Sequence, residues 1–381
     1  MFEQILNRMN KGPAAQRSFS KLPSWGMLAL LFLLFFCDVH RGLAQNELEV
    51  HFSYRPGAFP TLQEHIDQVD IILPAVFFVN KSGVVFGEIE SRVLGLGKEH
   101  QVKLMPQIKN FDANRGLFRK DWAHGVLTDP AARARTIHSM LHLCKKYRLW
   151  GMQVEFENVH IDDREALTAF YRAAAQTLHE NGYKISISAV HRTQDHAGPG
   201  TYSKWMMENW RGAYDLKAFG KIGEFVKITS YAQHTRRTTP GPSQSFTWLE
   251  KVTQYFLRFI PSEKLSLGIA MGAYHYFTVA NPNKYYQNAR SWSRSISLTE
   301  MRSLLEQYPG QSLIWDPTQK TFFGFIERGG LLEWFFADND VRSFETKLDL
   351  VEKYKLRAIN CWFSGDEDPR MWERIKEFRN N

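Results

Sequence analysis

The stretch W-G-M-Q-V-E-F-E-N, residues 150–158, decides how we interpret this chain of 381 residues. With a period of two, the apolar side chains at 152, 154 and 156 fall on one face of a strand, and Gln153, Glu155 and Glu157 fall on the other. The stretch is short and lies between two long helical patterns, which is typical of a strand buried on both faces of a parallel α/β sheet. The alternative is an edge strand whose glutamates are solvated.

Two carboxylates and an amide on a buried face are costly to desolvate unless they have partners. Adjacent carboxylates on one face also resist ionising together, so one of them tends to hold its proton near neutral pH. A carboxyl group that holds a proton beside a polar or charged neighbour can act as a general acid. We therefore expect Glu157 to be the catalytic residue.

The rest of the chain alternates strand and helix patterns. The strand patterns cover residues 48–54, 71–79, 102–108, 150–158, 184–190, 225–231, 265–271 and 357–363. Eight strand–helix units over roughly 330 residues predict a (β/α)8 TIM barrel with an inserted α+β subdomain between the seventh and eighth strands. The rival is a doubly wound open sheet, which is weakened because no glycine-rich phosphate loop follows the first strand.

The insertion is expected at approximately 272–330, where the strand–helix period breaks down and Tyr and Trp are frequent. Long connections without structure are rare in compact domains, so this segment predicts a folded unit with a helix at 298–308. A further strand is expected at 331–336, and a helix at 338–355 precedes the last barrel strand.

Residues 1–44 have the pattern of an export signal. A basic, polar segment precedes an apolar run at 26–37, and the small-x-small sequence Gly42–Leu43–Ala44 follows. We predict cleavage after Ala44, and an uncleaved membrane anchor is the alternative. Either way the body, residues 45–381, is expected outside the cytoplasm, in the periplasm or the extracellular space.

The composition limits the partners. The formal net charge is +8, but basic residues are scattered among acidic ones, so we expect no nucleic acid. The cysteines, Cys37, Cys144 and Cys361, lack metal-ligand spacing, and free thiols are expected. We predict a monomer without a metal or an organic cofactor, which contacts a membrane only if the leader stays uncleaved.

In such barrels the reactive groups lie at the C-terminal ends of the strands. The polar and aromatic residues expected there include Asn110, Glu157, Asn158, His191, Tyr231, Gln233, His234, Tyr274 and Trp362. An acid, hydrogen-bonding groups and a stacking surface together suit a sugar. The alternatives are core packing for Tyr231 and Trp362, and hydrogen-bonded structural roles for the two histidines.

Residues 151–158 resemble the catalytic strand of glycoside hydrolase family 18. They are most similar to its branch of spore-cortex and peptidoglycan hydrolases, whose run is close to Gly-x-Asn-x-Asp-Phe-Glu-Asn. Residues 228–234, I-T-S-Y-A-Q-H, resemble the sixth-strand segment that ends Tyr-Asp-x-His. Residues 248–252, 333–338 and 362–372 resemble later segments of that branch in the same order, so the resemblance extends from residue 48 to the end.

The resemblance implies a retaining hydrolase that cleaves N-acetylglucosamine-containing envelope glycan, such as peptidoglycan or a chitin-like polymer. Glu157 would protonate the glycosidic oxygen while the substrate's own 2-acetamido oxygen attacks the anomeric carbon. Glu155 would orient the acetamido nitrogen, Tyr231 would bond the acetamido carbonyl, and Trp362 would form the floor at the cleavage point. Further substrate-binding candidates are Gln153, Asn158, Gln233, Tyr274 and Asn110.

Several positions depart from the pattern. Glu155 replaces Asp, Gln153 replaces Asp or Asn, Trp150 replaces an Asp outside the core motif, and Gln233 stands in place of Asp. The extra methylene of Glu155 moves its carboxylate by about 1–1.5 Å, a misplacement that can cost on the order of 100-fold in rate. The readings left open are an unusual polymer, low activity, a barrel that binds glycan without cleaving it, and an envelope scaffold.

Overall fold

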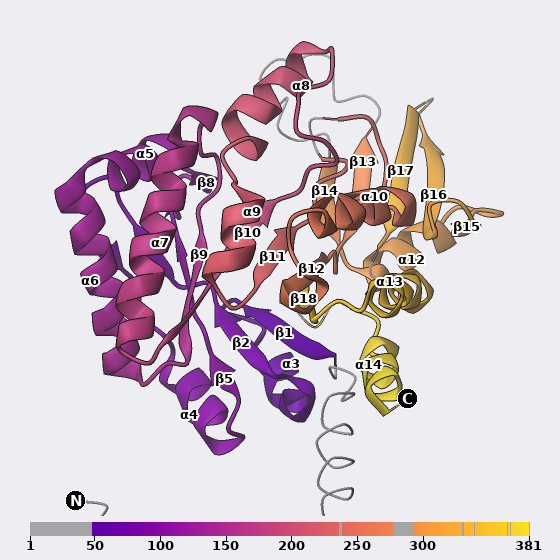
Figure 1. Ribbon diagram of the computed structural model, residues 1–381. Helices are drawn as coiled ribbons and strands as arrows, with labels where there is room; N and C mark the ends of the chain where they lie inside the picture. The colour runs from indigo at the N-terminus through magenta and orange to yellow at the C-terminus, as the bar shows by residue number, and fades with distance from the viewer. Residues whose placement is uncertain are drawn as a thin grey trace, which may run out of the picture. The chain divides into compact units, whose positions relative to one another are not determined.

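The computed structural model describes residues 48–235, 238–277, 293–329, 331–338, 340–363, 365 and 367–380 (Figure 1). The leader expected at 1–44 lies outside these ranges. Within the described ranges, no helix is both long enough and apolar enough to cross a membrane.

The body is built on a closed barrel of parallel strands. Its strands are β1 (Glu49–Tyr54), β2 (Ile71–Pro74) continued by β3 (Phe77–Val79), β5 (Lys103–Leu104) continued by β6 (Gln107–Lys109), β9 (Gly151–Glu155), β10 (Lys184–Val190), β11 (Val226–Thr229), β12 (Leu265–Ile269) and β18 (Ala358–Cys361). Each strand pairs in parallel with the next, and β18 pairs with β1. The sheet therefore closes on itself, and the open-sheet alternative is wrong.

The second and third strands are each interrupted after two to four residues. The breaks fall at residues 75–76 and 105–106, and Pro106 has no N–H to donate to a ladder. The third strand still bonds to both neighbouring strands across its break, because the Met105 amide donates to Ile72 O at 2.9 Å and the Gln153 amide donates to Pro106 O at 2.9 Å. Strand β4 (Val85–Phe86) pairs antiparallel with β3.

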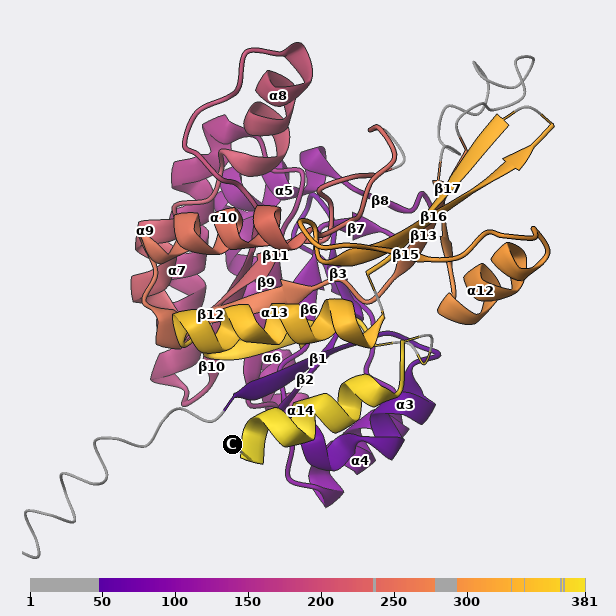
Figure 2. The same ribbon diagram turned by 90° about the vertical axis from the view of Figure 1, so that its right-hand side faces the viewer.

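Helices lie on the outside of the strands (Figures 1 and 2). They are α3 (Phe59–Glu64), α4 (Ser91–Glu99), α5 (Lys120–Thr128), α6 (Pro130–Tyr147), α7 (Arg164–Glu180), α9 (Leu216–Ile222), α10 (Phe246–Leu257), α13 (Val341–Tyr354) and α14 (Arg370–Asn380), with short turns η1 (Ile66–Gln68), η2 (Ile161–Asp163) and η4 (Ser262–Lys264). Helix α6 has a capped start, since Asp129 accepts from the Ala131 amide and Pro130 occupies the first position. Apolar strand residues such as Met152 and Val154 pack against these helices in one core.

Three elements near the C-terminal ends of the strands were not predicted. A hairpin of β7 (Phe111–Asp112) and β8 (Leu117–Phe118) precedes α5. Helix α8 (Thr201–Met206) and the π-helical turn η3 (Met207–Arg211) follow β10.

Between β12 and β18 the chain forms a second, antiparallel sheet. It comprises β13 (Ala273–Phe277), β14 (Ser293–Ile296), β15 (Ile314–Asp316), β16 (Thr321–Arg328) and β17 (Leu331–Ala337), in the order β14-β13-β17-β16-β15, with α12 (Leu298–Glu306). Ala273, Met301 and Phe335 belong to its own small core. Strand β17, expected as a separate element after residue 330, lies in the middle of this sheet.

Candidate active site

Glu155, the last residue of β9, lies between two lysines inside the barrel mouth. Its side chain is 3% exposed, with Oε1 at 3.2 Å from Lys227 Nζ and Oε2 at 3.7 Å from Lys109 Nζ. Burial alone would raise the pKa of Glu155, but the two ammonium groups outweigh it and lower that pKa. The Glu155 carboxylate is therefore ionised at neutral pH. Since β9 lies between β6 and β10 with every residue buried, the edge-strand alternative is wrong.

Glu157 behaves differently, although it lies two residues further along the same chain. Burial raises the pKa of Glu157 to about 7, the negative charge of Glu155 adds to the shift, and Lys109 and Lys227 oppose it. The two carboxyl groups are thus set apart: Glu155 is charged, while Glu157 holds a proton up to about neutral pH. This difference is the one that the alternation of the stretch predicted, and it suits Glu157 to donate a proton.

Asn110 fixes the backbone of Glu157. Its side chain is completely buried, accepts from the Glu157 amide at 3.0 Å, and donates to Glu157 O at 2.8 Å and to Arg119 O at 2.9 Å. The Tyr214 hydroxyl donates to Phe156 O at 2.8 Å, one residue earlier. Asn110 therefore acts as a positioning residue for Glu157, and its contact with a substrate stays a prediction.

Gln153 lies one layer deeper in the barrel. It is completely buried and accepts from Gln107 Nε2 at 2.9 Å and from Ser188 Oγ at 3.2 Å, while its own amide donates to Ser186 Oγ at 3.0 Å. These contacts satisfy an amide where the resemblance has a carboxylate or Asn. Gln153 consequently supports the strand beneath Glu155 through these bonds, and its contact with substrate stays a prediction.

Tyr231, Tyr274 and Trp362 line one cavity, with a volume of about 540 Å³. The Tyr231 hydroxyl lies 3.3 Å from Asn360 O, and its ring fits against β12 because a Cβ at Gly268 would come within 2.8 Å of that hydroxyl. The cavity adjoins the Glu155 cluster, since the Trp362 ring centroid lies 5.5 Å from Nζ of both lysines. The structure thus brings these three predicted residues together beside the carboxyl pair.

The profile of "Glycosyl hydrolases family 18" matches residues 66–368. The chain belongs to this family. Membership confirms the resemblance found in the sequence and makes the protein a glycoside hydrolase with a TIM-barrel fold.

Relatives and solved structures of this family 18 protein agree with the assignment. It is 21% identical over 350 residues to the uncharacterized glycosylase YvbX of Bacillus subtilis (strain 168), across 92% of this chain and 96% of that protein. It is 22% identical over 298 residues to the cortical fragment-lytic enzyme of the same organism, across 78% of this chain and 64% of that enzyme. The Bacillus cereus spore cortex-lytic enzyme SleL shares the fold with a TM-score of 0.74 at 20% identity, over 87% of this chain and 73% of SleL.

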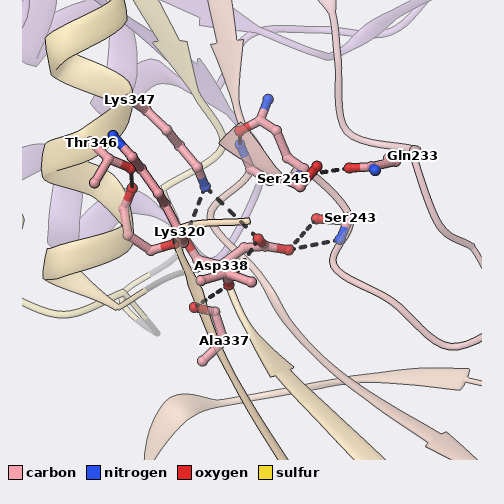
Figure 3. A network of polar contacts seen from close by, with 12 residues as sticks. Gln233, Ser243, Ser245, Lys320, Ala337, Asp338, Thr346 and Lys347 are labelled. Carbon is pink, nitrogen blue, oxygen red and sulfur yellow. Dashed lines mark hydrogen bonds and ion pairs between the residues drawn. The ribbon is translucent and has the colours of Figure 1, made fainter. Parts of the chain in front are cut away.

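The side chains of Gln233 and Asn158 bond to backbone groups of neighbouring segments in this family 18 protein. Gln233 Oε1 accepts from the Ser245 amide at 2.7 Å, at the start of α10 (Figure 3). The Tyr-Asp-x-His pattern has its Asp directly after the Tyr. In this chain the residue directly after Tyr231 is the exposed Ala232. The expectation that Gln233 replaces the Asp is therefore wrong, because Ala232 does. Asn158 adopts a φ of 53° and donates to Phe118 O at 3.1 Å, which ties the strand end to the β7–β8 hairpin.

The two histidines have structural contacts. His191 Nδ1 lies 2.9 Å from Thr229 O, and Nε2 lies 3.0 Å from Arg211 Nη2. Burial, with the charge of Arg211, lowers the pKa of His191 to about 3, so the ring is neutral and accepts from the guanidinium. His234 Nδ1 contacts Thr239 O at 3.0 Å within its own loop. The hydrogen-bonded alternative thus describes both.

Sequence reasoning missed the two lysines that hold Glu155. A signal was available for each: Lys227 alternates with Tyr231 on the inward face of a buried strand, and Lys109 directly precedes Asn110 at a strand end. Cys144 and Cys361 are buried free thiols, as expected. Among the residues that the structure describes, no group of three or more His, Cys, Asp or Glu side chains is arranged to hold a metal ion.

Proposed function

We propose that the protein hydrolyses glycosidic bonds in N-acetylglucosamine-containing envelope glycan, such as peptidoglycan or a chitin-like polymer, with retention of configuration. The observation that carries this proposal is the pair of carboxyl groups, with Glu155 ionised and the pKa of Glu157 raised to about 7 by burial, beside the cavity of Tyr231 and Trp362. The relatives named for lysis of cortex or cortical fragments support this class of polymer.

In the proposed reaction the substrate's acetamido oxygen attacks the anomeric carbon while Glu157 protonates the leaving oxygen. Glu155 Oε2 has no hydrogen-bond partner among the described residues, which suits it to accept the acetamido N–H. The Tyr231 hydroxyl would donate to the acetamido carbonyl, and the Trp362 ring would lie beneath the sugar. Glu157, now ionised, would then take a proton from the water that opens the oxazolinium intermediate.

A second candidate is a barrel that binds the glycan with little turnover. Two lysines hold the Glu155 carboxylate, and its strongest contact is with Lys227, not with Glu157. A carboxylate fixed in this way has less freedom to follow the acetamido group during the reaction. In this case the Trp362 cavity would bind sugar, and restoring Asp at position 155 would still give no cleavage.

Purified protein and its Glu157→Gln variant should be compared on peptidoglycan glycan strands and chitooligosaccharides. Loss of the acid should lower kcat by roughly 100-fold or more, and proton NMR of the first product should show the retained β anomer. Equal product release by both proteins rules out the catalytic role of Glu157. No release by either, with calorimetric sugar binding that Trp362→Ala abolishes, favours the second candidate.

We also propose that the protein acts outside the cytoplasm as a monomer, with residues 45–381 as one hydrolase body. The leader pattern of residues 1–44 and an envelope polymer as substrate support this placement.

A further inference from the structure

Lys109 lies in a ring of aromatic side chains at the mouth of the barrel. Its Nζ is 5.5 Å from the ring centroid of Phe111, 5.4 Å from that of Phe118 and 5.5 Å from that of Trp362. It is the last residue of β6 and lies directly opposite Glu155 in the sheet. Its side chain remains 12% exposed, so the ammonium group is held in place yet still reaches the solvent side of the site.

The charges of this cluster do not balance. Lys227 is completely buried and makes the closer contact with Glu155, at 3.2 Å, while Lys109 is 3.7 Å away. Among the described residues, Glu155 is the one acidic group within 4 Å of either ammonium. Two cations therefore face one ionised carboxylate as long as Glu157 holds its proton. A cation in a poorly solvated site is unfavourable without a counterion, and the aromatic rings cannot supply a full negative charge.

We propose that Lys109 selects glycans in which a sugar bound beside Trp362 carries a carboxylate. The inference rests on the proposed function and names its substrate class more closely: an N-acetylated glycan that is also acidic. The carboxylate would pair with Lys109 Nζ, while Phe111, Phe118 and Trp362 offer apolar faces to the sugar rings.

Arg55 also favours a negatively charged glycan in the cavity. It is exposed and lines the cavity together with Trp362, so a second cation faces the bound chain. Two chemical sources could present the carboxylate: a lactyl ether on an N-acetylated sugar, as in peptidoglycan, or a uronic acid that alternates with the N-acetylated sugar. Lys227 is too deeply buried to take this role, because its side chain has no exposed surface.

Binding should be measured in the Glu157→Gln background, so that turnover does not interfere. The probes are chitohexaose, peptidoglycan glycan strands with free lactyl carboxyls, the same strands with those carboxyls converted to amides, and hyaluronan oligosaccharides. We expect the free-carboxyl strands to bind on the order of tenfold more tightly than the amidated strands. Lys109→Met should remove this difference, and it should weaken the binding of free-carboxyl strands more than that of chitohexaose.

Lys103→Met is the matched control. Lys103 lies at the other end of the same barrel strand and also packs on an aromatic ring, with Nζ 5.1 Å from the Trp150 centroid. Its variant should keep the preference for the free carboxyl. Lys109→Arg, which keeps the charge, should keep it too and serves if the Met variant does not fold.

Two results overturn the proposal. In the first, the Glu157→Gln protein binds amidated strands as tightly as free-carboxyl strands, and hyaluronan as tightly as chitohexaose. This result is obtained with Lys109 in place and does not depend on how its variants fold. The other is an equal loss of affinity for neutral and acidic glycans in Lys109→Met. Preference for the peptidoglycan strands or for hyaluronan identifies the source of the carboxylate. Because these are binding measurements, absence of hydrolysis by the unaltered protein counts against the proposed function alone.

Discussion

Glu155 and Glu157 show how one strand can hold two carboxyl groups in different protonation states. They share a chain direction and lie two residues apart, but Glu155 has the ammonium groups of Lys109 and Lys227 within 4 Å. The energetic cost of burying Glu155 is thereby offset, while the cost of burying Glu157 appears as a raised pKa. The lysines thus do more than neutralise charge, because they decide which of the two carboxyls carries the proton.

This arrangement predicts the pH dependence of the activity. The pKa of Glu157 is raised to about 7, and the acid is competent while protonated, so kcat/KM should fall as the pH rises through about 7. The charged and titratable groups around it are Lys109, Lys227, Glu155, Tyr214 and Tyr231. Lys109 favours the ionised form of Glu157, so Lys109→Met should move this alkaline limb upward by roughly one pH unit.

The measurement is a kcat/KM profile between pH 5 and 9 on chitooligosaccharides, which avoids any charge on the substrate. Lys103→Met, at the far end of the strand, should leave the limb in place. A limb that stays fixed in Lys109→Met, or one that moves downward, contradicts the assigned coupling.

At the scale of elements, regular periodicity was the reliable guide. The strand pattern of residues 184–190 predicted β10 with its observed bounds, because the strand buries a continuous apolar face. The β7–β8 hairpin and α8 are short and carry no such face, and the hairpin packs partly on residues distant in sequence, such as Phe118 on Trp210 of η3 at 6.5 Å. Elements held by such contacts cannot be found from local pattern.

The same limit applies to the site. Glu157, Tyr231 and Trp362 could be placed from strand ends and the family resemblance, because each follows an apolar strand. The positioning role of Asn110 could not be predicted from the sequence, because its side chain bonds to the backbone of Glu157, which lies 47 positions further along the chain. Lys227 was missed because a lysine inside a strand pattern is normally assigned to solvent.

The bonds of Asn110 predict a measurable effect on catalysis. Asn110→Ala removes partners from a buried N–H and two carbonyl groups, and should lower the free energy of unfolding by about 2–4 kcal/mol. It should also reduce kcat on the order of 10- to 100-fold with a smaller change in KM, since the Glu157 backbone loses its fixed position. Thermal unfolding and steady-state kinetics on one preparation measure both.

Asn209→Ala is the control for Asn110. Asn209 is also buried, donates to Trp205 O at 2.9 Å and accepts from Lys120 Nζ at 2.9 Å. Its variant should lose stability without a comparable loss of kcat. Similar kcat for both variants would show that Asn110 has a structural role alone.

At the scale of the whole body, Asp338 joins the second sheet to the barrel (Figure 3). It follows β17 directly and is completely buried, with Oδ2 accepting from the Ser243 amide at 2.8 Å and from Ser243 Oγ at 2.7 Å. Lys347 of α13 donates to Asp338 O at 3.3 Å and lies 3.9 Å from its carboxylate. One side chain thus connects the sheet, a barrel helix and the loop after β11.

Breaking this connection should destabilise the sheet and the barrel together. Asp338→Ala leaves the Lys347 ammonium buried without its counterion, and burial already lowers the pKa of Lys347, so we expect a loss of about 3–5 kcal/mol in the free energy of unfolding. The double variant Asp338→Leu with Lys347→Met should recover part of that loss, because it removes both charges but leaves the Ser243 amide and hydroxyl without their acceptor. Glu250→Ala, which breaks the exposed pair with Lys353 at 2.8 Å, should cost under about 1 kcal/mol. Denaturant unfolding, followed by far-UV circular dichroism and by Trp fluorescence, measures the unaltered protein and the three variants. Two separate transitions in the unaltered protein would refute the coupling. A cost for Asp338→Ala no larger than that for Glu250→Ala would refute it as well.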